Sequence, residues 1–310
     1  MAKLKQDAIT NVDLLEFLNG YSDFSFEIQV LNALITGGFA CDHGGTYDDP
    51  ATKKPRQFDI RATKSFGKRF LRLAVECKNL RSNFPLLVTC LPRRDEESFY
   101  EVVVSVNPES HPIELPDGPY SLAMLPQSRN VRLSGADSIY SPGQPVGKSC
   151  DQVGRLPSDE ISATDSEVYD KWSQALSSAD DLTYLACSDG NDRTGDVAMS
   201  LVFPVVVVPN GRLWVTHFDK DGNRTADPHQ TDRCSYFVRR SYFHRSPSSG
   251  DQVTLSHLEF VTLSGLGSLI QDVCGTEEKL DKTFPMHSVF ERMTKGGWGE
   301  SFGSQEAVSR

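Results

Sequence analysis

The sequence predicts an α/β fold in which helices flank a mixed central sheet. A helical apolar stripe at 22–36 is followed by runs rich in β-branched and alternating apolar residues at 57–63 and 70–80. A second helical stretch at about 165–179 is followed by the apolar run 202–208. Helices that come between strand-like runs in this way are typical of a layered α/β domain.

The remaining elements follow from the same local signals. Asn11 predicts the start of a short helix, and Pro209-Asn210-Gly211 predicts a hairpin that joins 202–208 to 212–217. Further strands are expected near 39–42, 86–91, 99–106, 235–240 and 257–262, and a final helix is expected at 264–273.

Composition places the chain among ordinary globular proteins. Its 310 residues are 38% hydrophobic and 24% charged, and the longest apolar run, 201–208, is too short to cross a bilayer and contains Pro204. The polar beginning has no signal-peptide pattern. Seven scattered cysteines lack CxxC spacing, which argues against a disulfide framework or a structural zinc site. We therefore expect a cytoplasmic protein with no membrane association.

The domain organisation is predicted from a shift in composition. Residues 107–159 are rich in Pro, Ser and Gly and lack the apolar content for a core of their own. This stretch is expected to be an insertion in a single domain spanning 1–295, and 296–310 are expected to form a flexible tail.

Charge is distributed unevenly along the chain. The net charge of −10 disfavours a nonspecific nucleic-acid coat, but residues 53–81 hold ten Lys or Arg and two acids, Asp59 and Glu76, which gives that segment +8. A basic segment around two carboxylates suits a site that cleaves phosphodiesters. A solvated basic hairpin would have the same composition.

The two acids are expected to face each other. If Gly67-Lys68 is a two-residue hairpin loop, Asp59 lies directly opposite Glu76, and both side chains project from one face of the sheet. Lys78 belongs to the same face, whereas Cys77 points to the opposite, apolar face, where buried cysteine is the simplest interpretation.

This arrangement predicts a metal site. Two close carboxylates repel each other unless a cation lies between them, and Mg²⁺ prefers such oxygens. The ion would polarise a phosphoryl oxygen, Lys78 would stabilise the developing charge, and the backbone carbonyl of Cys77 could add a ligand. Glu27 leans toward the apolar face of its helix, where it either joins Asp59 and Glu76 at the metal or extends to solvent.

A helix with Glu27, a strand, a strand with Asp59, and a strand with Glu76-Cys77-Lys78 together resemble the core of the PD-(D/E)XK nucleases, the restriction-endonuclease-like superfamily. The resemblance covers about residues 22–80 and departs from the named pattern at Phe58, which stands in place of proline. It implies a restriction-endonuclease-like core and cleavage dependent on Mg²⁺ or Mn²⁺, with Asp59 and Glu76 as metal ligands and Lys78 as the catalytic lysine.

The resulting expectation is a metal-dependent endonuclease that hydrolyses nucleic-acid phosphodiesters, DNA in preference to RNA, in a restriction or defence system by analogy. Arg61, Lys64 and Arg72 are expected to contact the nucleic acid. A homodimer or a partner subunit could strengthen the binding of the substrate. The alternatives are a catalytically silent nuclease-like module that binds nucleic acid or a protein, and a structural protein whose carboxylates pair with arginines.

Overall fold

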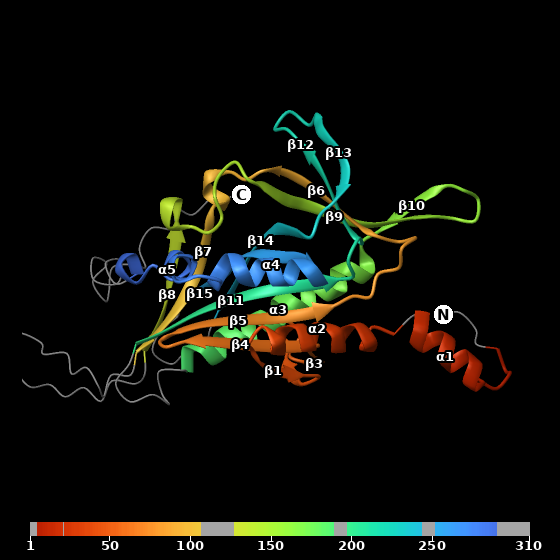
Figure 1. The fold of residues 1–310 in the computed structure, drawn as a ribbon, viewed down its shortest axis with the longest axis horizontal. Coiled ribbons are helices and arrows are strands. Elements are labelled where there is room, and N and C mark those ends of the chain that lie inside the picture. The colour runs from red at the N-terminus through yellow and green to blue at the C-terminus, as the bar shows by residue number, and fades with distance from the viewer. Residues whose placement is uncertain (1–4, 21, 107–126, 189–196, 244–251, 290–310) are drawn as a thin grey trace, which may run out of the picture.

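The structure is a computed structural model that describes residues 5–20, 22–106, 127–188, 197–243 and 252–289. Within these residues it shows a mixed α/β architecture: a large central sheet with both parallel and antiparallel pairs, flanked by helices (Figure 1). The predicted α/β class with a mixed sheet is therefore confirmed. The helices are α1 (Asn11–Gly20), α2 (Phe24–Thr36), α3 (Ser166–Ser188), α4 (Leu263–Cys274) and α5 (Glu277–Thr283).

Thirteen strands form the main sheet, and β2 and β3 form a separate pair. The strands up to the middle of the chain are β1 (Ala40–His43), β2 (Thr46–Asp48), β3 (Pro55–Gln57), β4 (Ile60–Phe66), β5 (Arg69–Cys77), β6 (Leu86–Pro92), β7 (Phe99–Val106) and β8 (Gln127–Ser134). Those that follow are β9 (Pro145–Arg155), β10 (Ile161–Thr164), β11 (Val197–Val208), β12 (Leu213–Phe218), β13 (Arg224–Gln230), β14 (Arg233–Phe243) and β15 (Gln252–Thr262).

One half of the sheet contains the N-terminal elements. Its order is β1-β4-β5-β11, in which β1, β4 and β5 are antiparallel neighbours and β5 runs parallel to β11. A parallel pair requires a crossover connection. The chain that links β5 to β11 includes α3, which packs against both strands (Figure 1).

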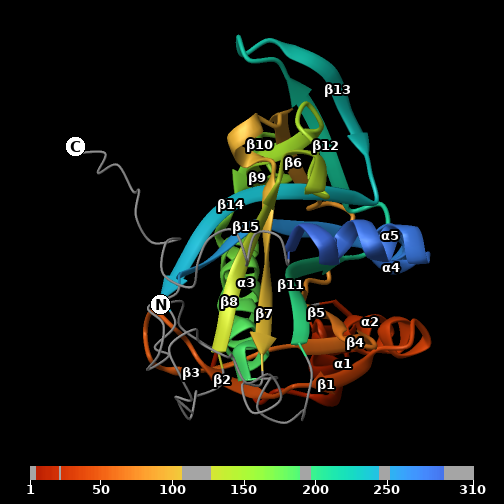
Figure 2. The same cartoon turned by 90° about the vertical axis from the view of Figure 1, so that its left-hand side faces the viewer.

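The other half continues from β11 through β15, β14, β9 and β6 to β12 and β13. The strands β12 and β13 form an arm that projects from the body of the molecule (Figure 2). The strands β7 and β8 pair with each other, and β7 also pairs with the beginning of β11. The strand β11 thus joins the two halves.

Two apolar cores lie on opposite faces of β5 and β11. The first holds α2, α4 and the residues of β5 that include Leu71, Leu73 and Val75. The second holds α3 together with Ala74 of β5 and alternate residues of β11 such as Val206. Side chains of a strand point alternately to its two faces, so every residue of β5 that faces α3 belongs to the second core or to its polar margin.

The β4–β5 hairpin has the predicted register. Phe66 pairs with Arg69 across a two-residue turn, and Ile60 pairs with Val75 at the far end. Gly67 adopts φ +66°, a conformation that glycine reaches without a steric cost. Continued by one residue, this register places Asp59, which precedes β4, opposite Glu76.

The predicted 202–217 hairpin is wrong. The strand β11 pairs with β5 and β15, whereas β12 pairs in parallel with β6, so the turn at Asn210 sends the chain to another part of the sheet. The strand β11 forms backbone hydrogen bonds with β5 on one side and β15 on the other, which a single local hairpin with β12 would not provide. This tertiary pairing overrides the turn signal.

The stretch predicted as an insertion contributes to the sheet. Residues 127–134 and 145–155 form β8 and β9, and β9 pairs with β6 along seven residues. Residues 107–126 and the predicted tail 296–310 lie outside the described residues. The division into a 1–295 domain and a tail therefore stays a prediction. No described helix combines the length and apolar character needed to cross a bilayer.

Candidate functional site

The predicted carboxylates meet where β4 begins and β5 ends. Glu76 is fully buried on the face of β5 that α3 covers. Asp59 immediately precedes β4, and its Oδ2 accepts a hydrogen bond of 2.7 Å from the backbone N–H of Cys77. This bond fixes the Asp59 carboxylate at the end of the strand that carries Glu76.

A lysine that the sequence did not indicate bridges the two acids. Lys171 of α3 places its Nζ 2.7 Å from Asp59 Oδ2 and 3.3 Å from Glu76 Oε2. Burial alone would lower the pKa of Lys171, but the charges of Glu76 and Asp59 outweigh it and raise the pKa above its ordinary value. The bridging group is therefore a charged ammonium.

Glu76 remains only partly compensated. Its Oε2 faces Lys171, but its Oε1 is buried with no hydrogen-bond partner. Burial first, and then the charge of Asp59, raise the pKa of Glu76 well above its ordinary range. A buried carboxylate oxygen without a partner is costly, and such orphan groups are a feature of sites that bind an ion or a ligand.

Glu27 joins this cluster from α2. Its Oε2 lies 3.3 Å from Nε2 of His43 on β1, and burial followed by the charge of Asp59 raises its pKa. Glu27 is thus partly buried and pairs with His43, and its role at a metal stays a prediction. The ammonium of Lys171 pairs with the other two carboxylates, Asp59 and Glu76.

Lys78 lies beside this cluster but does not pair with it. Its Nζ lies 3.1 Å from Glu167 and 3.7 Å from Asp23, at the edge of a cavity of about 490 Å³. The same cavity is lined by the basic side chains Arg81 and Arg155. The position predicted for Lys78 beside Asp59 and Glu76 is thus occupied by Lys171.

The residues predicted to contact nucleic acid have structural roles in this fold. Arg61 is buried beneath α3, where it donates to Ser178 and Asp181, and its contact with nucleic acid stays a prediction. The Nζ of Lys64 donates to the carbonyl oxygen of Gly37 at the end of α2. Arg72 is half-buried, with its guanidinium 5.7 Å from the ring centre of Phe70.

Cys77 behaves as its alternation predicted. Its side chain is fully buried in the first core, and burial raises the pKa of its thiol well above the ordinary value. A thiol of this kind is a poor nucleophile. The backbone of Cys77 is the part that faces the carboxylates, through the N–H that donates to Asp59.

The carboxylate cluster has the donor chemistry of a site for a hard divalent cation, but not the placement of one. As placed, no group of three His, Cys, Asp or Glu side chains among the described residues is close enough to hold an ion. The Lys171 ammonium lies between the two carboxylates. The chemistry of the set nevertheless fits Mg²⁺ or Mn²⁺, because the groups are carboxylate oxygens and Glu76 Oε1 lacks any other partner.

Comparisons with known proteins give no match: no family model, curated protein or solved structure is similar to this chain.

Proposed function

We propose that the protein is a metal-dependent endonuclease of the PD-(D/E)XK type, hydrolysing phosphodiester bonds of nucleic acid, DNA in preference to RNA. The observation that carries the proposal is the pair of carboxylates Asp59 and Glu76 at the β4–β5 strand ends, where one Glu76 oxygen is buried without a hydrogen-bond partner and Glu27 of α2 is near enough for Asp59 to raise its pKa. The elements α2, β1, β4 and β5 follow one another in this sense along the chain, and β1, β4 and β5 are adjacent in one sheet, which supports a restriction-endonuclease-like core.

Mg²⁺ or Mn²⁺ would be held by Asp59, Glu76 and Glu27. An extended residue turns its N–H and C=O to the same side of the strand, so the carbonyl of Cys77 is a fourth candidate ligand. A divalent ion bound there supplies Lewis-acid polarisation of a phosphoryl oxygen.

The chain's own cations have separate tasks in this proposal. Lys171 lies next to the carboxylates and keeps a positive charge there, where negative charge develops on the phosphate. Lys78 faces the 490 Å³ cavity with Arg81 and Arg155, and these cations would hold the phosphates that flank the scissile bond. Asp23 and Glu167 orient Lys78 from two sides.

The test is cleavage of plasmid and single-stranded DNA, and of RNA, with Mg²⁺ or Mn²⁺. Asp59→Asn and Glu76→Gln are expected to lower cleavage at least about a hundredfold, since each removes a charged ligand at the reacting centre. Lys171→Ala is expected to be as severe, and Lys78→Ala to weaken substrate binding more than turnover.

Asp219→Asn is the matched control, because Asp219 accepts backbone hydrogen bonds in an exposed turn remote from α3. It should cleave like the wild type. A Glu76→Gln variant as active as the wild type would remove these carboxylates from the mechanism.

A second function has one observation in its favour. Because the Lys171 ammonium pairs with both Asp59 and Glu76, a cation of the chain itself links the two carboxylates. A catalytically silent module that binds nucleic acid or a partner protein would keep this arrangement. A wild-type protein that binds DNA but is inert with both metals on DNA and RNA would favour this module over the enzyme.

A further inference from the structure

A second cavity of about 440 Å³ lies between β14, the loop before β9 and the β12–β13 arm. It shares no lining residue with the cavity at Lys78 or with the carboxylate site. Its lining includes Arg93, Arg233, His217 and His229 but no Asp or Glu, in a chain whose net charge is −10. A cavity whose charged side chains are all cations, accompanied by imidazoles, is typical of a site for anions.

Arg93 is the strongest indication. Its side chain is 5% exposed, and its Nη1 donates to the backbone carbonyl of Ser141. Its Nε is buried without a partner, and no carboxylate of the described residues forms an ion pair with it. Glu259 and Glu97 act on this guanidinium only from a distance, and a buried guanidinium without a paired anion is unfavourable, so an anionic ligand would relieve the cost.

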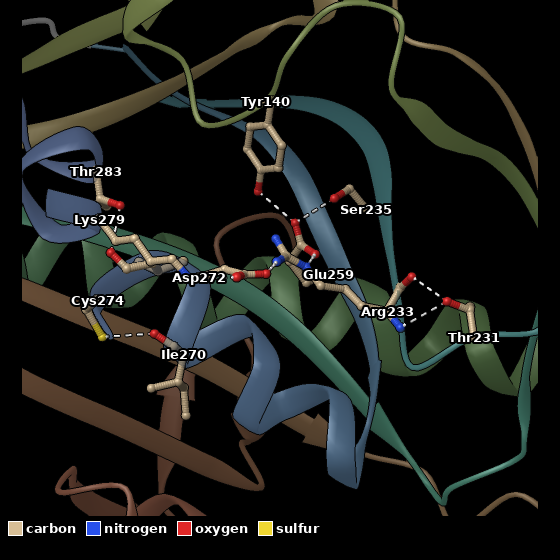
Figure 3. Close-up of polar contacts among 11 residues, drawn as sticks. Tyr140, Thr231, Arg233, Ser235, Glu259, Ile270, Asp272, Cys274, Lys279 and Thr283 are labelled. Atoms are coloured by element: carbon tan, nitrogen blue, oxygen red, sulfur yellow. Dashed lines mark hydrogen bonds and ion pairs between the residues drawn. The ribbon is translucent and has the colours of Figure 1, made fainter. Parts of the chain in front are cut away.

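A hydrogen-bond network behind the cavity wall holds Tyr140, Arg233 and Ser235 in place (Figure 3). The fully buried Glu259 accepts hydrogen bonds from Tyr140, Ser235 and the Nε of Arg233. The ring of Tyr140 in turn lies 5.0 Å from the Arg93 guanidinium. Side chains fixed in this way lose little conformational entropy when a ligand binds.

The opposite wall carries two imidazole rings, of which His229 donates its Nδ1–H to the carbonyl oxygen of Asp227 and keeps Nε2 as an acceptor. His217 of β12 and His229 of β13 have ring centres 5.4 Å apart. Burial, followed by the neighbouring His229, lowers the pKa of His217, so at neutral pH it is an uncharged ring that can donate one N–H.

We propose that this cavity binds the phosphate group of a phosphate monoester of about nucleotide size. A phosphate presents three oxygens in different directions, which can accept from Arg93 and His217 at once, and the hydroxyl of a phosphate monoanion can donate to Nε2 of His229, whereas a carboxylate presents two oxygens in one plane. The charge of a monoester, about −1.5 to −2 at neutral pH, also exceeds the single positive charge of Arg93. The histidines of the β12–β13 arm would therefore contribute to binding as well. The volume lies in the range of small-molecule sites, about 300–1,000 Å³. The monoester can be a free nucleotide or the 5′ end of a nucleic-acid strand.

The experiment is isothermal titration calorimetry at pH 7 with inorganic phosphate, adenosine 5′-monophosphate, adenosine, and an oligonucleotide with or without a 5′-phosphate. The wild type should bind the phosphate-bearing ligands and not adenosine. Preference for the nucleotide or for the 5′-phosphorylated oligonucleotide distinguishes the two sources. Arg93→Gln should weaken binding at least tenfold, and the double variant His217→Gln/His229→Gln several-fold.

Two controls separate this site from the rest of the surface. Arg224→Gln changes an exposed cation of the same arm that does not line the cavity, and Asp59→Asn alters the carboxylate site; both should bind phosphate like the wild type. The histidine variant tests the proposal even if Arg93→Gln does not fold. A wild type that binds none of the phosphate ligands at millimolar concentration, or folded Arg93→Gln and histidine variants that bind as tightly as the wild type, would overturn it.

Discussion

Lys171 is the residue on which the carboxylate cluster most depends. Its ammonium contacts Asp59 and Glu76 from a helix that is remote from both in sequence. Removal of one partner from a buried ion pair typically costs about 3–5 kcal/mol, because the remaining charges are left uncompensated.

We therefore expect Lys171→Met to lower the free energy of unfolding by about 3–5 kcal/mol in EDTA. Because a divalent ion would replace the lost charge, Mg²⁺ should raise the melting temperature of this variant more than that of the wild type. Thermal unfolding with EDTA or Mg²⁺ measures both effects. Lys282→Met, at an exposed position of α5, is the control, and equal Mg²⁺ responses in all three proteins would contradict a metal site.

The sequence predicted Asp59 and Glu76 because strand alternation and a two-residue turn determine which residues face each other. It did not predict Lys171, although a signal was present: Lys171 lies three residues after Val168 and four before Ala175, within the buried stripe of α3. A lysine in a buried stripe indicates a buried acidic partner. Which acids it meets depends on how α3 crosses the sheet, and no local pattern determines that.

His257 should make the fold sensitive to acid. It is 3% exposed and stacked on Tyr140, and burial, followed by the charges of Arg93 and Lys148, lowers its pKa to about 2. In the unfolded chain this histidine binds a proton below about pH 6.5, whereas in the folded chain its ring stays neutral. The free energy of unfolding therefore decreases as the pH falls below 6.5.

We expect this loss to be about 1.4 kcal/mol per pH unit between pH 6 and 4.5, and His257→Gln to remove it. Urea unfolding across this pH range measures the slope. His287→Gln changes an exposed histidine and should keep the wild-type slope. An unchanged slope in His257→Gln would show that other groups dominate the acid response.

At the scale of elements, α3 is the support of the candidate site. It packs against β5 and β11 and carries both Lys171 and the fully buried Leu176. We expect Leu176→Ala to lower the free energy of unfolding by about 2–5 kcal/mol, through lost burial and a residual cavity.

The same helix provides the control for this substitution. Leu185 is 45% exposed, and Leu185→Ala should change the free energy of unfolding by about 0.5 kcal/mol or less. Urea denaturation of the two variants compares them directly. Equal losses would mean that α3 does not bury the face described here.

Helices and strands with strong local sequence patterns were predictable, whereas the strands with which they pair were not. Both helices at the N-terminus, the β4–β5 hairpin and the strands β6 and β7 lie close to their predicted ranges. Pro209-Asn210-Gly211 has the composition of a hairpin turn but connects strands in different parts of the sheet. The strands β8 and β9 lack clear alternation, and their pairing partners stabilise them instead.

For the whole molecule, the basic segment 53–81 is less available than its composition suggests. At least four of its ten cations have carboxylate partners within the described residues: Arg56, Arg61, Arg69 and Lys78. If the protein binds DNA, these paired cations release fewer counterions than free ones would, and the plot of log K against log salt should have a slope shallower than the about −9 expected if all ten neutralised phosphates. Fluorescence anisotropy in EDTA over a salt series measures the slope, and a value of about −9 or steeper would contradict this expectation.

The position of β11 at the centre of the sheet has a consequence for synthesis on the ribosome. Cys77 at the end of β5 pairs with Val207, which follows it by 130 residues. At a synthesis rate of about 5–20 residues per second, roughly 6–26 s pass between the synthesis of Cys77 and that of its partner. During this time one edge of the apolar strand β5 is unpaired and accessible to other nascent chains. The nascent chain therefore needs protection during that interval, and β5, the strand that carries Glu76, gains its partner β11 only when about the first two thirds of the protein have emerged.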